Sequence, residues 1–197
     1  VQTHTSIRMN FLEEAYEAVD ALDLDDPVLM CEELGDVLMQ VAFHTCMEQE
    51  TGRFTWEQVC DGVCQKLIER HPNIFGTQPG YEGITDWDAL KNKEKGRRTL
   101  ADDLESVPRA TPALMRAAKL QKRAARHGAA LQGADAAALA AAAENLQTAQ
   151  PASAQAEQAV GELLFAAANL ARQAGVDPEQ ALQKANEAFC SAAGPVA

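Results

Sequence analysis

The chain has 197 residues, which is enough for one domain or two small ones, and its hydrophobic fraction of 47% is sufficient for a packed core. Its formal net charge of −12 disfavours nucleic acid as a partner, because the phosphate backbone carries the same sign. No apolar run approaches the roughly 20 residues of a membrane span and no secretory signal is visible, so we expect a cytoplasmic protein without a membrane partner.

The first half of the chain predicts three helices. A loose apolar face over residues 5–23 predicts the first of them. Asp26 followed by Pro27 is a typical helix start, and the second helix is expected to reach residue 50. Thr55 with Gln58 three residues later resembles a capping box, which predicts a third helix that ends near residue 70.

The second half is also helical in pattern but richer in alanine. Gly- and Pro-rich sequence after residue 70 indicates a loop, followed by a short helix from Asp86 and a polar connector. A helix over residues 111–127 carries five basic residues, and two Ala-rich helical stretches separated at Pro151 come after it. Asp177 with Pro178 repeats the earlier start signal. Because only 5% of the residues are aromatic and no strand pattern occurs, we expect an all-α fold.

An acidic segment over residues 12–36 holds ten carboxylates and neither Lys nor Arg. It contains EExxE, ending at Glu17, and ExxD over residues 33–36. Residues three or four apart share a helix face, so Glu14 should lie beside Glu17 and Glu33 beside Asp36. Antiparallel packing of the two helices would gather these carboxylates, at an electrostatic cost unless a cation neutralises them. A site made of carboxylate oxygens suits Mg²⁺, which also bridges to phosphate.

A solvated acidic face is the alternative interpretation of this segment. Glu33 and Asp36 alternate with Leu34, Val37 and Leu38, at the edge of an apolar face, and this favours the metal site. A di-iron carboxylate site is disfavoured, because that chemistry uses Glu-x-x-His and none of the four His residues has a Glu three positions before it.

The chain also contains a weak internal repeat. GDVLMQVAF at residues 35–43 resembles GELLFAAAN at residues 161–169, and TWEQVCDGV resembles the later DPEQALQKA in the same order. Ala159 and Glu162 stand in the second copy where the first has Glu33 and Asp36. We therefore expect three parts: a first domain with intact acidic motifs, a connector with a helix, and a degenerate Ala-rich copy, over residues 1–98, 99–128 and 129–197.

Four segments resemble, in order and spacing, the MazG-type nucleoside triphosphate pyrophosphohydrolases: EEAYEAVDAL, EELGDVLMQVAFH, KLIERHPNIFG and DWDALKNKEKG. The resemblance extends over residues 2–128, and the two-copy layout is similar to members with tandem MazG domains. It implies an all-α, MazG-like helical bundle that forms a homodimer with a four-helix core. It also implies a house-cleaning activity on the nucleotide pool, in which an NTP or dNTP and water give NMP or dNMP and pyrophosphate.

The same resemblance implies the site residues. Mg²⁺, with Mn²⁺ as a substitute, would be held by Glu14, Glu17, Glu33 and Asp36. Glu13 and Glu32 would orient or deprotonate the attacking water. Substrate contacts would come from five further residues: Asn10, Lys66, Arg70, Trp87 and Lys91. The second copy has lost its acidic motifs, so the first copy must carry any activity.

Two other functions remain alternatives. One is a catalytically inactive module on the same fold that binds nucleotides or has a regulatory role. The other is a purely structural helical dimer.

Cys60 and Cys64 lie one helical turn apart, but no second Cys or His pair has zinc spacing. We therefore interpret them as buried thiols rather than as a metal site.

Overall fold

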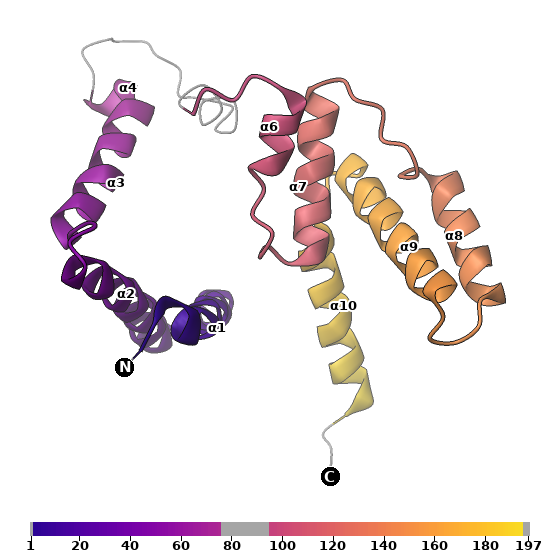
Figure 1. Cartoon of the computed structure of the whole chain (residues 1–197). Coiled ribbons are helices and arrows are strands. Elements are labelled where there is room, and N and C mark those ends of the chain that lie inside the picture. The colour runs from indigo at the N-terminus through magenta and orange to yellow at the C-terminus, as the bar shows by residue number, and fades with distance from the viewer. Residues whose placement is uncertain (1, 76–94, 195–197) are drawn as a thin grey trace. The chain divides into compact units, whose positions relative to one another are not determined.

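The computed structural model describes residues 2–75 and 95–194, and these residues are organised as helices joined by turns. The chain forms two compact units, Val1–Asp86 and Trp87–Ala197. Figure 1 shows α1 to α4 in the first unit and α6 to α10 in the second. Within the described ranges there is no strand, which confirms the all-α prediction for them.

The first unit is built on a hairpin of two long helices, α1 (His4–Leu24) and α2 (Pro27–Glu50). The side chain of Asp26 accepts hydrogen bonds from the backbone N–H groups of Val28 and Leu29, and Pro27 occupies the first helical position. Asp25 adopts the left-handed conformation with φ 53°, which Asp tolerates better than most residues. The predicted start of the second helix is therefore confirmed, and the turn fixes where the two helices meet.

The third helix, α3 (Trp56–Arg70), begins with the predicted capping box between Thr55 and Gln58. It contacts α2 and is followed by the single turn α4 (Pro72–Phe75). Figure 1 shows that α3 leads away from the hairpin toward α4. The second half of α3 consequently lies apart from the surface between α1 and α2.

A polar cluster joins the open ends of the hairpin. The His4 and His44 rings are stacked, with centroids 4.9 Å apart, and their Nδ1 atoms are 2.6 Å apart. His4 Nε2 lies 2.5 Å from the Glu48 carboxylate, which is buried and also accepts from Arg53. Since a buried carboxylate is stable only when paired, this cluster holds the start of α1 against the end of α2.

The second unit begins with α6 (Leu100–Glu105) and α7 (Ala113–Arg126), which are joined through one buried carboxylate. Asp103 is 1% exposed, and its Oδ2 lies 2.6 Å from Arg126 Nη2 and 3.1 Å from His127 Nε2. Arg123 donates to the Asp103 backbone oxygen at 2.7 Å and also contacts Ser106. Part of the basic group expected on this helix is therefore used inside the unit.

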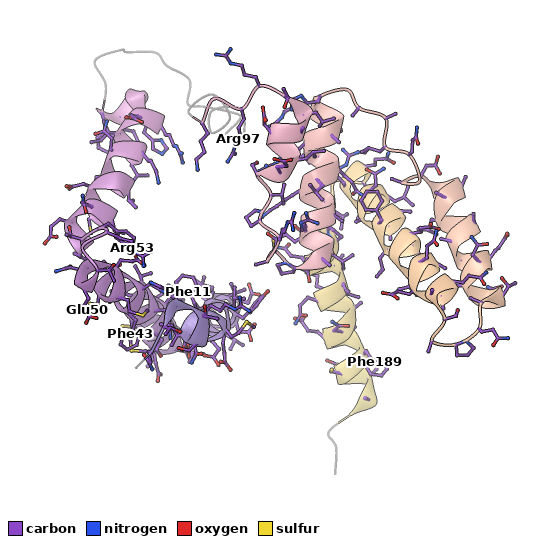
Figure 2. All side chains as sticks on the ribbon, viewed as in Figure 1. Phe11, Phe43, Glu50, Arg53, Arg97 and Phe189 are labelled. Atoms are coloured by element: carbon purple, nitrogen blue, oxygen red, sulfur yellow. The ribbon has the colours of Figure 1, made fainter. Side chains whose placement is uncertain are left out.

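Alanines form the contact between α8 (Ala136–Thr148) and α9 (Ala154–Gln173). Ala142, Ala159, Ala166 and Ala168 are buried, and such small side chains let two helices approach closely. α10 (Pro178–Ala193) starts at the predicted Asp177 cap and packs on α7 and α9. It extends beyond them as far as the exposed Phe189 (Figure 2).

Three expectations differ from the structure. The polar connector contains α6, which was not predicted, and α7 starts at Ala113 rather than at residue 111. The prediction of buried thiols is wrong, because Cys60 and Cys64 are both exposed. α3 buries none of its residues in the first unit, and this leaves both thiols uncovered. The expected helix from Asp86 lies outside the described residues.

None of the described helices is long and apolar enough to cross a bilayer.

Candidate metal centre

Three carboxylates from the two helices of the hairpin converge. Glu14 and Glu17 come from α1 and Glu33 comes from α2, and one oxygen from each lies within 4.8 Å of those from the other two. Glu14 and Glu33 are half-buried and Glu17 is exposed. The i, i+3 spacing puts the first two on one face of α1, and the antiparallel hairpin brings α2 against that face. We refer to these three residues as the acidic cluster.

Desolvation and repulsion within the acidic cluster raise the pKa of two of its carboxylates, Glu17 and Glu33. The pKa of Glu17 is raised above the ordinary 4.5, first by partial desolvation and then by the charges of Glu33, Glu14 and Glu13. The pKa of Glu33 is raised by the same two causes, with Asp36 and Glu32 as the leading charges. The cluster therefore carries more negative charge than its surroundings compensate.

Asp36, the fourth ligand expected from the sequence, is not in the group that meets within 4.8 Å. It is half-buried, and its charge is the strongest of those that raise the pKa of Glu33. Glu13 and Glu32 are exposed and lie near enough to affect the pKa of Glu17 and of Glu33, respectively. All three residues border the acidic cluster, and their individual roles stay predictions.

Three of the five expected substrate-binding residues lie in the part of the chain that the structure describes. Asn10 is exposed on α1, and Lys66 is exposed on α3. Within the described residues, no hydrogen bond or ion pair joins either of them to the three carboxylates. Arg70 is half-buried at the end of α3. Trp87 and Lys91 lie outside the described residues.

Gln40 is a residue that the sequence reasoning missed. It is 4% exposed, and its Nε2 lies 3.3 Å from Glu14 Oε1, so the amide donates to a member of the acidic cluster. Its Oε1 is buried without a partner among the described groups. Gln40 follows Asp36 by four residues and thus shares its helix face, which was the available signal. We interpret Gln40 as a residue that positions the Glu14 carboxylate.

The corresponding hairpin of the second unit carries no comparable cluster in its described residues. Ala159, which occupies the repeat position of Glu33, is 2% exposed and packed between helices. Glu162, at the repeat position of Asp36, is exposed and accepts from Gln158 at 2.8 Å. Packed alanine thus occupies the repeat position at which the first hairpin has a carboxylate of the acidic cluster.

The chemistry of the acidic cluster fits a hard divalent cation. Its donors are carboxylate oxygens, which Mg²⁺, Ca²⁺ and Mn²⁺ prefer, and no thiol or imidazole belongs to the group. A bound cation would relieve the repulsion that raises the pKa of Glu17 and Glu33. The residues present therefore suit a magnesium ion.

Comparisons with known proteins point to one family. Residues 2–75 match the model of the MazG nucleotide pyrophosphohydrolase domain, and this range contains the whole acidic cluster. The chain is 39% identical to the nucleoside triphosphate pyrophosphohydrolase of Escherichia coli K12, over 95% of this chain and 75% of that protein. It is 38% identical to the nucleoside triphosphate pyrophosphohydrolase/pyrophosphatase MazG of Thermotoga maritima, over 95% of this chain and 73% of that protein.

Proposed function

The chain belongs to the MazG family of nucleotide pyrophosphohydrolases, and from this premise we propose that its first unit is a Mg²⁺-dependent hydrolase of nucleoside triphosphates. The proposed reaction converts an NTP or dNTP and one water into NMP or dNMP and pyrophosphate, which would remove surplus or noncanonical nucleotides. The observation that carries the proposal is the convergence of Glu14, Glu17 and Glu33 within 4.8 Å inside the matched domain.

The residues divide into ligands, proton acceptors and cations. Glu14, Glu17, Glu33 and Asp36 would hold the metal, and Mn²⁺ would substitute for Mg²⁺ at the same oxygens. When bound, the metal supplies Lewis-acid polarisation of a phosphate oxygen and offsets the charge of the leaving pyrophosphate. The acids beside the ligands, Glu13 and Glu32, would orient the attacking water and accept its proton.

The triphosphate also needs cationic donors. We assign this role to Lys66 and Arg70, which lie one turn apart on α3 and would donate hydrogen bonds to phosphate oxygens. Asn10, Trp87 and Lys91 are proposed contacts to the nucleoside end of the substrate. These five assignments rest on the motif resemblance.

The second unit would have a structural role. Its equivalent hairpin has Ala159 in place of an acidic ligand, and that alanine is sealed between helices. A buried methyl group offers neither a ligand atom nor room for a hydrated cation. We assign the activity to the first unit alone.

A second copy of the chain is the proposed partner. Apolar side chains on α1 and α2 remain exposed in the first unit, among them Tyr16, Val19, Leu22, Leu34 and Leu38. A helical hairpin must bury its apolar stripe against another layer, and a homodimer with a four-helix core would provide one.

The test is pyrophosphate release from a panel of NTPs and dNTPs, measured with Mg²⁺ and with EDTA. Release that requires Mg²⁺ and yields a nucleoside monophosphate as co-product is expected. Orthophosphate release would place the cleaved bond elsewhere and contradict the assignment. Nucleotide binding without any release would favour the inactive binding module instead.

A further inference from the structure

A pocket opens in the first unit. It has a volume of about 410 Å³, and its walls come from α1, α2, the loop after α2 and α3. Its lining includes Arg8, Phe11, Val41, His44, Phe54 and Val59. Pockets of a few hundred Å³ with mostly apolar walls and few polar groups are typical of small-molecule sites.

The pocket and the acidic cluster share the helices α1 and α2. Phe11 precedes Glu14 by three residues on α1, and His44 follows Gln40 by four residues on α2. Gln40 in turn touches Glu14, with 3.3 Å between amide nitrogen and carboxylate oxygen. Each spacing is one helical turn of about 5 Å, so the pocket starts one turn from the carboxylates. If the phosphates of a nucleotide bind at the acidic cluster, its nucleoside would reach the pocket, which starts one helical turn away.

Ring contacts position two of the residues that line the pocket, Phe11 and His44. The His44 ring stacks on His4 and meets the edge of Phe11, with ring centroids 4.9 Å and 5.9 Å apart, respectively. Its Nδ1 is occupied by His4 Nδ1 at 2.6 Å. Aromatic and branched apolar walls favour a planar ring that can lie against them.

Arg8 is the cationic group of the pocket lining. Its guanidinium is exposed, and no ion pair or hydrogen bond occupies it within the described residues. The hydroxyl of Thr45, which also lines the pocket, already donates to the Val41 carbonyl at 2.8 Å. Arg carries donors in a planar fork and no acceptor, and it pairs with two neighbouring acceptors, such as O6 and N7 of guanine.

We propose that this pocket holds the nucleobase of the substrate and that Arg8 selects oxopurines, whose O6 and N7 accept both of its donors. The inference rests on the proposed function for its phosphate end, since the acidic cluster fixes where the nucleoside begins. Adenine offers a donor at the position of O6, so only one of its two groups can pair with Arg8.

Binding can be measured apart from turnover. The α,β-methylene analogues of GTP and ATP keep all phosphates but cannot be cleaved at the α–β bridge, and calorimetry with Mg²⁺ gives their affinities for the full chain. The guanine analogue should bind at least about fivefold more tightly. Arg8→Met should abolish the preference, whereas Arg109→Met, at an exposed arginine of the second unit, should preserve it. Equal affinity for both analogues in the unmodified chain would overturn the role of Arg8.

The pocket itself is tested in the unmodified chain by methyl NMR of Val41 and Val59. Both resonances should shift with either nucleotide analogue and stay in place with the methyl ester of the same α,β-methylene triphosphate. Val59→Trp, which fills the pocket, should weaken both nucleotide analogues at least tenfold, and Val63→Trp, one turn further at an exposed site, should not.

Unmoved methyl resonances in the presence of a bound analogue would overturn the pocket assignment even with an active enzyme. Absence of analogue binding would overturn it as well. Shifted resonances without pyrophosphate release would leave the base site standing and contradict the proposed hydrolysis, so the two failures are distinguishable.

Discussion

The carboxylates of the acidic cluster repel one another as long as no cation lies between them. In the folded chain, the pKa of Glu17 and that of Glu33 lie above the ordinary 4.5, because desolvation and neighbouring acids disfavour the charged form. The folded state therefore binds their protons more tightly than the unfolded state does. The stability that these two groups contribute is present below pH 4.5 and is lost as pH rises through the raised values.

This coupling predicts a pH-dependent effect of Mg²⁺. The increase in melting temperature caused by Mg²⁺ should be large near neutral pH and should shrink on acidification, beginning above pH 4.5, as protons displace the metal. Differential scanning fluorimetry with and without Mg²⁺, repeated from neutral pH down to pH 4.5, measures this increase in melting temperature. A double substitution, Glu17→Gln with Glu33→Gln, should flatten the profile. An equally large Mg²⁺ effect at both ends of the range would contradict the prediction.

The ligand roles predict loss of turnover without loss of fold. Glu33→Gln or Asp36→Asn should lower pyrophosphate release by about 100-fold or more, since each removes the charge of a proposed metal ligand. Circular dichroism should show unchanged helix content. Glu162→Gln is the matched control, because Glu162 occupies the repeat position of Asp36 in the second unit and is exposed. Full activity in either ligand variant would remove that residue from the metal site.

Gln40 predicts a weaker and more specific effect. Gln40→Leu removes the donor that holds the Glu14 carboxylate but keeps a side chain of similar size. Residues that orient metal ligands typically contribute 10- to 100-fold to metal affinity, so the Mg²⁺ concentration for half-maximal activity should rise about tenfold. Gln49→Leu, at an exposed position of the same helix, should leave it unchanged. A normal Mg²⁺ dependence in Gln40→Leu would assign Gln40 to packing alone.

At the scale of elements, local start signals predicted the beginnings of three described helices, α2, α3 and α10. Asp26-Pro27, Thr55 with Gln58, and Asp177-Pro178 all act as expected, because a cap satisfies backbone N–H groups next to it in sequence. The acidic motifs likewise placed Glu14, Glu17 and Glu33 together, since helical periodicity and one antiparallel turn suffice.

Features that depend on distant residues could not be predicted in this way. The capping box of α6 uses Thr99 and Asp102, and the T-x-x-D pattern was the available signal in a segment that looked merely polar. The burial of Asp103 depends on two arginines and a histidine that lie 20 to 24 residues later in the chain. The exposure of the two α3 thiols follows from the small area that α3 shares with α2, which no local pattern encodes.

The buried carboxylate between α6 and α7 predicts a local loss of stability. Asp103→Ala would remove the buried carboxylate that Arg126 and His127 contact, and breaking a buried ion pair typically costs about 3 kcal/mol or more. Amide hydrogen exchange should accelerate in α6 and α7 and stay unchanged in α1 and α2, which belong to the other unit. Glu105→Gln, at an exposed position of α6, is the control. Unchanged exchange in α6 would show that apolar packing alone holds it.

At the scale of the whole molecule, the two units manage their apolar surface in different ways. Among the described residues, the hairpin of α8 and α9 closes on buried alanines and exposes a few large apolar side chains, whereas the hairpin of α1 and α2 has few buried apolar residues and exposes more of the large ones. Leu38 is 56% exposed and Tyr16 is 56% exposed, on neighbouring helices. Burial of apolar surface stabilises a protein by about 25 cal/mol per Å². Contact with a second copy of the chain would remove these side chains from water and give this stabilisation. We therefore expect the hairpin of α1 and α2 to need a partner more than the hairpin of α8 and α9 does.

This contrast predicts a dimer formed through the first unit. Light scattering should give twice the chain mass of 21.2 kDa, and Leu38→Glu should give the single mass, because two facing carboxylates would be brought into an apolar contact. Gln49→Glu adds the same charge at an exposed polar position of α2 and should remain dimeric. Phe189→Glu on the exposed end of α10 tests the second unit as the alternative contact. If Phe189→Glu is monomeric and Leu38→Glu is still dimeric, the interface lies on α10 instead. A mass of one chain for the unmodified protein at micromolar concentration would refute the dimer.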